Sequence, residues 1–179
     1  WACSRVAGAC DGARQKKSKD LNTYHLNRRY CMKLLRYGTR GSERPGLLDS
    51  IGRLRDLSAH VSDIGGATLL PEALEKLRAL DITRLPEVPG TPRIGAGVAG
   101  VGKSICVGLN YSDHAAESNM PVPAEPILFM KPTSAIVGPN DEVEIPLKSE
   151  KTDWEVELGI VIGKPGKYIP ENRALEHVA

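Results

Sequence analysis

Residues 153–163 read DWEVELGIVIG, which is the clearest strand pattern in the chain. Side chains alternate between the two faces of a strand, so Asp153, Glu155 and Glu157 share one face. The opposite face is apolar from Trp154 onward, and the end of the stretch is apolar on both faces. We therefore predict a strand over 154–163 that runs into a protein interior.

The acidic face of this stretch needs a compensating charge. Carboxylates along one strand face repel one another, and buried ones persist only where a cation offsets their charge. A hard divalent ion such as Mg²⁺ or Mn²⁺ accepts oxygen ligands of this kind. A solvated edge strand, or ion pairs with Lys148 or Lys151, would explain the same residues, so the spacing alone leaves metal binding open.

Toward the N-terminus the pattern predicts a small α/β unit. A strand over 33–37 is followed by a hairpin of strands 46–49 and 52–57. Pro71 then opens a helix, because a proline at the first helical position loses no hydrogen bond. We expect the helix to cover the hairpin with its apolar stripe, which consists of Leu74, Leu77 and Leu80.

A stretch rich in proline and glycine, residues 86–102, predicts a linker. We place a domain boundary there, with a small N-terminal domain over 32–97 and a second domain over 98–179. Beyond the linker we predict short strands and two helices, so that the fold class is α+β and rich in β-structure. The expected strands are 104–108, 127–130, 134–137 and 142–145, and the expected helices cover 110–118 and begin at Pro170.

Residues 1–31 differ from the rest of the chain. They carry a net charge of +5, whereas the remaining residues carry −3, and all 13 prolines lie after them. They show no regular periodicity and no apolar core of a signal peptide. A transit peptide is one interpretation; we favour upstream translated sequence, non-native or disordered, with Met32 as the natural start.

The overall composition excludes several classes of protein. Hydrophobic residues make up 41% and charged residues 26%, which is typical of a globular protein. Aromatic residues make up 4% and the net charge is +2, so we expect no nucleic-acid partner. The longest apolar run is too short to cross a membrane. The sequence contains no C-x-x-C pair, and we expect Cys106 to be a buried thiol. The default location is the cytoplasm.

Residues 97–104, GVAGVGKS, match the spacing of a phosphate-binding loop. That loop works only between a strand and a helix, where backbone amides converge on the phosphates. Here a linker precedes the match and a strand-like run follows it. We therefore interpret the stretch as part of the linker.

Two further patterns carry chemistry. His114 and Glu117 lie three residues apart on a predicted helix, where they can touch. A carboxylate beside an imidazole raises its basicity, as a general base acting on water requires. The alternative is an ion pair on a surface helix. Lys131 ends an apolar strand, where it can meet a substrate carboxylate or simply extend into water.

These motifs, in this order, resemble the fumarylacetoacetate hydrolase family. The start of the resembling region, MKLLRYG at 32–38, looks like the bacterial branch named ureidoglycolate lyase or diketo-sugar-acid hydrolase. The motifs that carry the resemblance are ICVGLNY at 105–111, HAAE at 114–117, EPILFMKP at 125–132 and DWEVELG at 153–159.

The resemblance implies a mixed β-roll catalytic domain behind a small N-terminal domain, usually in a homodimer. It implies Mg²⁺ or Mn²⁺ held by Glu155 and Glu157, with His114 and Glu117 as the pair that activates water. Lys131 and Tyr111 would bind the substrate. The family's third metal carboxylate lies in an Asn-Asp segment, which we expect beyond Ala179.

The implied reaction is hydrolysis of a C–C bond in a small 2-oxo or 2,4-dioxo acid. The metal would stabilise the enolate that develops as the bond breaks. Ureidoglycolate lyase and the decarboxylating or isomerising members share these residues, so they remain alternatives. A catalytically incomplete fragment is the alternative of another class.

Overall fold

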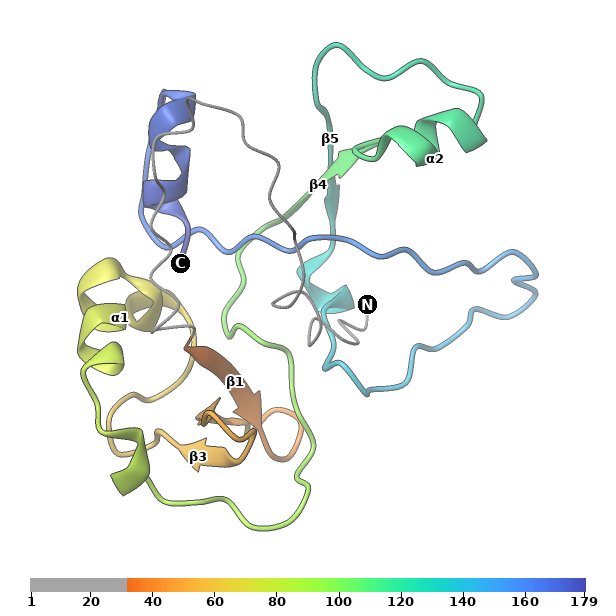
Figure 1. The fold of residues 1–179 in the computed structure, drawn as a ribbon. Coiled ribbons are helices and arrows are strands. Elements are labelled where there is room, and N and C mark those ends of the chain that lie inside the picture. Colours follow the sequence, from red (N-terminus) through yellow and green to blue (C-terminus); the bar gives the residue numbers. More distant parts are fainter. Residues whose placement is uncertain (1–31) are drawn as a thin grey trace.

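The computed structural model describes residues 32–179 (Figure 1). Its first sheet is antiparallel, with the order β1 (Lys33–Tyr37), β2 (Arg44–Leu48) and β3 (Leu54–Asp56). The strand at 33–37 and the hairpin after it are thus confirmed. Asp49 closes the hairpin turn, since its carboxylate accepts bonds from the amides of Ile51 and Arg53.

Helix α1 (Pro71–Arg78) packs against this sheet, as its pattern predicts. Pro71 begins the helix, and Leu74 and Leu77 face the interior. A 3₁₀ helix over Gly66–Leu69 precedes α1 and another over Ile82–Arg84 follows it. Together these elements enclose a leucine-rich core, formed by Leu47, Leu57, Ile64, Leu69, Leu74, Leu77 and Leu85.

The proline- and glycine-rich segment 86–102 is irregular, but its backbone is hydrogen-bonded to β3 and to Ile64. The Asp56 amide donates to the Pro86 carbonyl at 2.9 Å, and the Val88 amide donates to the Leu54 carbonyl at 2.9 Å. Farther along, the Ala99 amide donates to the Ile64 carbonyl at 2.7 Å. The segment therefore forms a border of the N-terminal unit, and the boundary near residue 97 stays a prediction.

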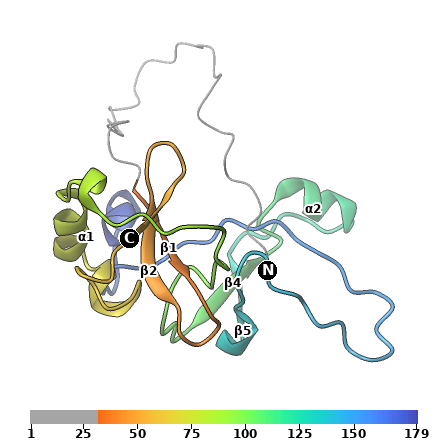
Figure 2. The same ribbon diagram turned by 90° about the horizontal axis from the view of Figure 1, so that it is seen from below.

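The second sheet has two antiparallel strands, β4 (Ser104–Gly108) and β5 (Ile127–Lys131). Helix α2 (Ser112–Glu117) follows β4. All three elements are predicted from the sequence. From both directions of view, this sheet and α2 lie on one side of the molecule and α1 with the first sheet on the other (Figures 1 and 2).

Three expected strands are wrong. The predicted strand 134–137 is replaced by a 3₁₀ helix over Thr133–Ala135. Residues 142–145 form no strand, and 154–163 form none except for a bridge between Ile162 and Val178. A strand needs a neighbour that accepts its backbone hydrogen bonds, and within residues 32–179 no strand lies beside these segments.

The end of the chain folds back as a 3₁₀ helix over Glu171–His177, which begins after Pro170 where the sequence predicts a helix. The His177 ring bonds the Lys164 carbonyl at 3.0 Å, and the Ala179 amide donates to the Val161 carbonyl at 2.9 Å. The structure is thus a mixed arrangement of small sheets and few helices. Among residues 32–179, no helix is both long and apolar enough to cross a membrane.

Candidate functional site

Helix α2 carries the predicted pair of His114 and Glu117. It begins after Tyr111, and Asp113 accepts a hydrogen bond from the His114 amide at 2.9 Å. Tyr111 occupies the N-cap position and makes no side-chain capping bond. Ala115 is the buried residue of the helix.

The side chains of His114 and Glu117 are both exposed. In the part of the chain that the structure describes, no hydrogen bond or ion pair joins them. The structure therefore places the two residues on one short helix without aligning them as a base and its orienting acid. Catalytic pairs in unliganded structures are often long or poorly aligned, so this geometry leaves their role a prediction.

Tyr111 and Lys131 lie at opposite ends of the second sheet. The register pairs Gly108 with Ile127 and Ser104 with Lys131, and Tyr111 follows shortly after Gly108. Four residues of strand separate the two ends, which is roughly 13 Å. Lys131 extends over the Phe129 ring, with its amine 5.9 Å from the ring centre. The ladder thus does not bring these two predicted substrate ligands together.

Glu155 and Glu157 lie in the irregular segment between the 3₁₀ helices Thr133–Ala135 and Glu171–His177. Part of this segment forms a long loop that extends away from both sheets (Figures 1 and 2). Both are exposed, and neither Lys148 nor Lys151 pairs with them within residues 32–179. Their carboxylates are the hard oxygen donors that Mg²⁺ or Mn²⁺ prefers. The described residues contain no group of three or more potential ligands, so the donor type fits a divalent cation while the number of donors is incomplete.

The glycine-rich stretch 97–104 does not lie between a strand and a helix, as a phosphate-binding loop requires. Its first residues belong to the irregular border of the N-terminal unit, and β4 begins at Ser104 where a phosphate loop requires a helix. The interpretation as connecting chain agrees with this placement. Cys106, expected to be buried, is instead half-buried in β4.

A charged network is the polar feature that the sequence does not predict. Arg93 donates to Glu43 at 2.9 Å and to both oxygens of Asp141 at 2.6 Å. Arg36 joins the network through Asp63, at 2.6 Å, and through Glu43, at 3.4 Å. Arg93 is 48 residues from Asp141, and no local motif links them, so only the folded chain reveals the pairing.

The network fixes the ionisation of its carboxylates. Hydrogen bonds from the Arg93 guanidinium, and a further one from the Gly138 amide, lower the pKa of Asp141 to about 2. The same guanidinium lowers the pKa of Glu43. Gly138 itself lies against the Ile94 carbonyl. Arg93 therefore joins the β1–β2 turn to the loop after β5.

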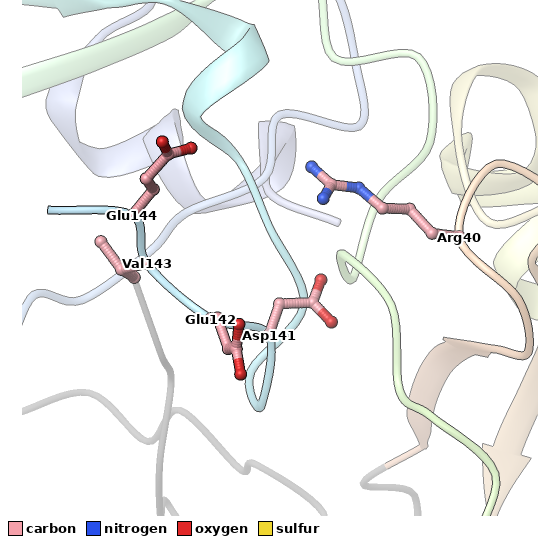
Figure 3. Close-up of a pocket in the computed structure, with 5 residues that line it drawn as sticks. All are labelled: Arg40, Asp141, Glu142, Val143 and Glu144. Atoms are coloured by element: carbon pink, nitrogen blue, oxygen red, sulfur yellow. The ribbon is translucent and has the colours of Figure 1, made fainter. Parts of the chain in front are cut away.

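A shallow cavity of about 450 Å³ borders this network. In Figure 3, Arg40 reaches from the β1–β2 turn toward the loop that carries the acidic side chains. The six site residues predicted from the sequence do not line it. Its lining consists of Arg40, Asp141, Glu142, Val143 and Glu144.

Comparison with known proteins points to one family. Residues 103–179 match the profile described as fumarylacetoacetate (FAA) hydrolase C-terminal. Residues 103–179 therefore belong to the fumarylacetoacetate hydrolase family. Two solved structures agree: the fumarylacetoacetate hydrolase of psychrophilic Exiguobacterium antarcticum is 32% identical with a TM-score of 0.64. A protein titled "putative HpcE protein", from Mycobacterium smegmatis, is 33% identical with a TM-score of 0.65.

Curated bacterial proteins are more similar still. A Burkholderia multivorans protein named "putative hydrolase" is 62% identical over 148 residues, and one from Burkholderia orbicola has the same identity and length of match. In both, the match covers 83% of this chain and 52% of the relative. The two solved structures are likewise covered to 52% and 51%, against 82% of this chain. The chain thus spans about half the length of the relatives it matches.

Proposed function

We propose that this chain is part of a divalent-metal-dependent hydrolase that cleaves a C–C bond in a small 2-oxo or 2,4-dioxo acid. The observation that carries the proposal is the family match over residues 103–179, which contains every predicted site residue. The printed names of the curated relatives favour hydrolysis over a lyase reaction. We place the enzyme in the cytoplasm and expect it to work as a homodimer.

In this proposal α2 supplies the proton transfer. The His114 imidazole takes a proton from water, and the water oxygen attacks the distal carbonyl of the substrate. The bond between C3 and C4 then breaks, its electron pair passes to the 2-oxo side as an enolate, and C3 receives the proton from the imidazole. Glu117, three residues along the helix, orients the imidazole and stabilises its charged form. The exposure of both side chains leaves them free to rearrange around a substrate.

The remaining predicted side chains bind the substrate and the cation. Lys131 pairs with the substrate carboxylate, and the Tyr111 hydroxyl donates a hydrogen bond to it. Glu155 and Glu157 would hold the divalent cation, with further donors from substrate, water or protein outside the described residues. When bound, the cation supplies positive charge that draws electrons toward the 2-oxo group.

A chimeric enzyme tests this function. In it, this chain replaces the 148 matched residues of the Burkholderia multivorans protein, to which it is 62% identical. We expect Mg²⁺- or Mn²⁺-dependent hydrolysis of one member of a panel of 2,4-dioxo acids. Calorimetry should give tight metal binding that Glu155→Gln and Glu157→Gln each abolish together with activity.

The variant His114→Ala distinguishes two roles for His114, that of a general base and that of a metal ligand. It should lower kcat by about 10²–10⁴ and leave metal affinity unchanged, because a general base contributes that factor. His60→Ala, at an exposed position of the N-terminal unit, is the matched control and should change neither. Full activity of His114→Ala would place the base elsewhere, and loss of metal binding would make His114 a ligand.

A further inference from the structure

The chain between Lys131 and Asp141 contains two closed turns. In the first, the Ala135 amide donates to the Pro132 carbonyl at 3.0 Å. In the second, the Asp141 amide donates to the Gly138 carbonyl at 3.2 Å, and the Gly138 amide donates to the Asp141 carboxylate at 2.7 Å. A hydrogen-bonded turn restricts the backbone torsions of the residues inside it. The position of Asp141 therefore restrains the end of β5 that carries Lys131.

Asp141 is fastened to the N-terminal unit. Arg93 donates to both of its carboxylate oxygens at 2.6 Å, which is the strong two-point contact of a guanidinium with a carboxylate. Arg93 also donates to Glu43 of the N-terminal unit at 2.9 Å. The backbone at Gly138 lies so close to the same unit that a Cβ atom there would be 2.3 Å from the Ile94 carbonyl oxygen. The second turn is thus held directly against the N-terminal unit.

The strand beside Lys131 is attached to the same unit. Ser104 of β4 is the register partner of Lys131. Just before β4, the Ala99 amide donates to the Ile64 carbonyl at 2.7 Å. The opposite end of the ladder leads into residues 109–126, which make no hydrogen bond or ion pair with the N-terminal unit within residues 32–179. The ladder is therefore attached to the N-terminal unit at its Lys131 end.

We propose that Arg93 is a positioning residue: through Asp141 it sets where the Lys131 end of β5 lies, and thereby the affinity of Lys131 for the carboxylate of the substrate. The inference rests on the proposed role of Lys131 in substrate binding. A two-stranded ladder is marginal in water, so it needs an attachment outside itself to keep this end in one place. Holding a lysine in one ion-pair geometry costs conformational entropy, and a strand end that is already fixed lowers that cost.

A double-variant cycle on the chimeric enzyme tests the inference. The probe is pyruvate, a small 2-oxo acid, titrated by calorimetry into the Mg²⁺-loaded chimera. We expect Arg93→Ala to raise the Kd of pyruvate about tenfold, as the loss of a charge-assisted contact does, and to leave the Kd of Mg²⁺ unchanged. Lys131→Ala should weaken pyruvate binding at least as much. Arg93→Ala added to Lys131→Ala should cause no further loss, because Arg93 acts through Lys131.

Two further variants separate positioning from folding. Arg93→Lys keeps the charge but lacks the planar fork that bonds both oxygens of Asp141, and it should give an intermediate Kd. Arg173→Ala breaks an exposed ion pair with Glu176, and as the matched control it should leave the Kd unchanged. With a 2,4-dioxo acid as substrate, Arg93→Ala should raise KM about tenfold at constant kcat, since the contact stabilises ground state and transition state alike.

Hydrogen exchange of the full 179-residue chain gives a second measurement that needs no ligand. Arg93→Ala should speed amide exchange over 133–141 and at the Lys131 end of the ladder, whereas Arg173→Ala should change neither. Equal exchange in these two variants would overturn the inference. Additive losses of pyruvate affinity in the cycle would overturn it as well, because they would show that Arg93 does not act through Lys131.

The failure of this inference and the failure of the proposed function give different results. Pyruvate binding that follows the expected cycle, with no hydrolysis of any dioxo acid, would refute the hydrolase proposal alone. Hydrolysis in which Arg93→Ala changes neither the Kd of pyruvate nor KM would refute this inference alone. A chimera that neither binds pyruvate nor hydrolyses a dioxo acid would overturn both.

Discussion

Leucine side chains are buried in one part of the chain and exposed in the other. In the N-terminal unit, residues 32–102, Leu47 is 1% exposed and Leu57 is completely buried. In residues 103–179, Leu128 is 65% and Leu158 is 78% exposed. The difference lies in the neighbours that each segment finds. The N-terminal unit contains a sheet, a helix and a border that close around one core, whereas β4 and β5 have only each other.

This contrast shows that a regular strand has two requirements. The alternation of side chains specifies the faces, and a neighbouring strand supplies the hydrogen bonds. β2 has β1 and β3 beside it and forms a regular strand. Residues 154–160 have the stronger pattern and remain irregular.

The largest expected effect comes from the enclosed core. Leu47→Ala removes a fully buried side chain and should lower the free energy of unfolding by about 2–5 kcal/mol. Leu158→Ala makes the same chemical change at an exposed position and should stay within about 0.5 kcal/mol. Urea titration followed by circular dichroism measures both. Equal losses would mean that residue 158 is buried in solution and that the contrast is false.

The next largest loss of stability is expected where residues 97–99 contact the rest of the N-terminal unit. A side chain at Gly65 would collide with the Ala99 carbonyl, whereas at Gly97 there is nothing within 4 Å. Gly65→Ala should therefore cost about 1–3 kcal/mol, as overpacking does, and Gly97→Ala should be neutral or slightly stabilising. The same urea titration compares them. A tolerated Gly65→Ala would show that residues 97–99 do not dock on the unit.

Arg93 connects the two parts, so its removal should loosen the loop after β5. Arg93→Ala removes the ion-pair partner of Asp141 and leaves Glu43 with Arg36 at 3.4 Å. We expect a smaller fall in the urea midpoint than for Leu47→Ala, and a clear rise in proteolysis within 133–145. Arg173→Ala breaks an exposed pair with Glu176 and serves as control. Equal urea midpoints and equal proteolysis of the two variants would show that Arg93 does not hold the loop after β5.

The smallest effect is acid dependence. The pKa of Asp141 is lowered to about 2 by Arg93, against an ordinary value near 4. Its stabilising contribution is therefore present above about pH 4 and is lost as the pH falls toward 2. Asp141→Asn should flatten this part of the stability profile between pH 5 and 2.5. A wild-type profile that Asp141→Asn leaves unchanged would show that the ion pair does not form in solution.

The sequence predicts those features that neighbouring residues determine. Pro71 with Leu74 and Leu77 defines α1, and the turn after Asp49 defines the hairpin, because each pattern is complete within a few residues. His114 and Glu117 share a helix for the same reason. Their roles, and those of Glu155 and Glu157, stay predictions.

The remaining features depend on distant segments. The pairing of Arg93 with Asp141 spans 48 residues, and nothing in the local sequence indicates it. The strand predicted over 154–163 fails because side-chain alternation says which faces a strand has and not whether a neighbour is present. The candidate site is affected most, since the two carboxylates predicted to bind a metal, Glu155 and Glu157, lie in that stretch.

Hydrogen exchange of the full chain, followed residue by residue, separates enclosed segments from open ones. Backbone amides exchange slowly where hydrogen bonds are enclosed in a core and quickly where they face water. We predict strong protection in β1, β2 and α1, weak protection in β4 and β5, and none over 154–160. Protection over 154–160 equal to that of β2 would show that this segment already has a strand beside it, and the contrast between the two parts of the chain would then be false.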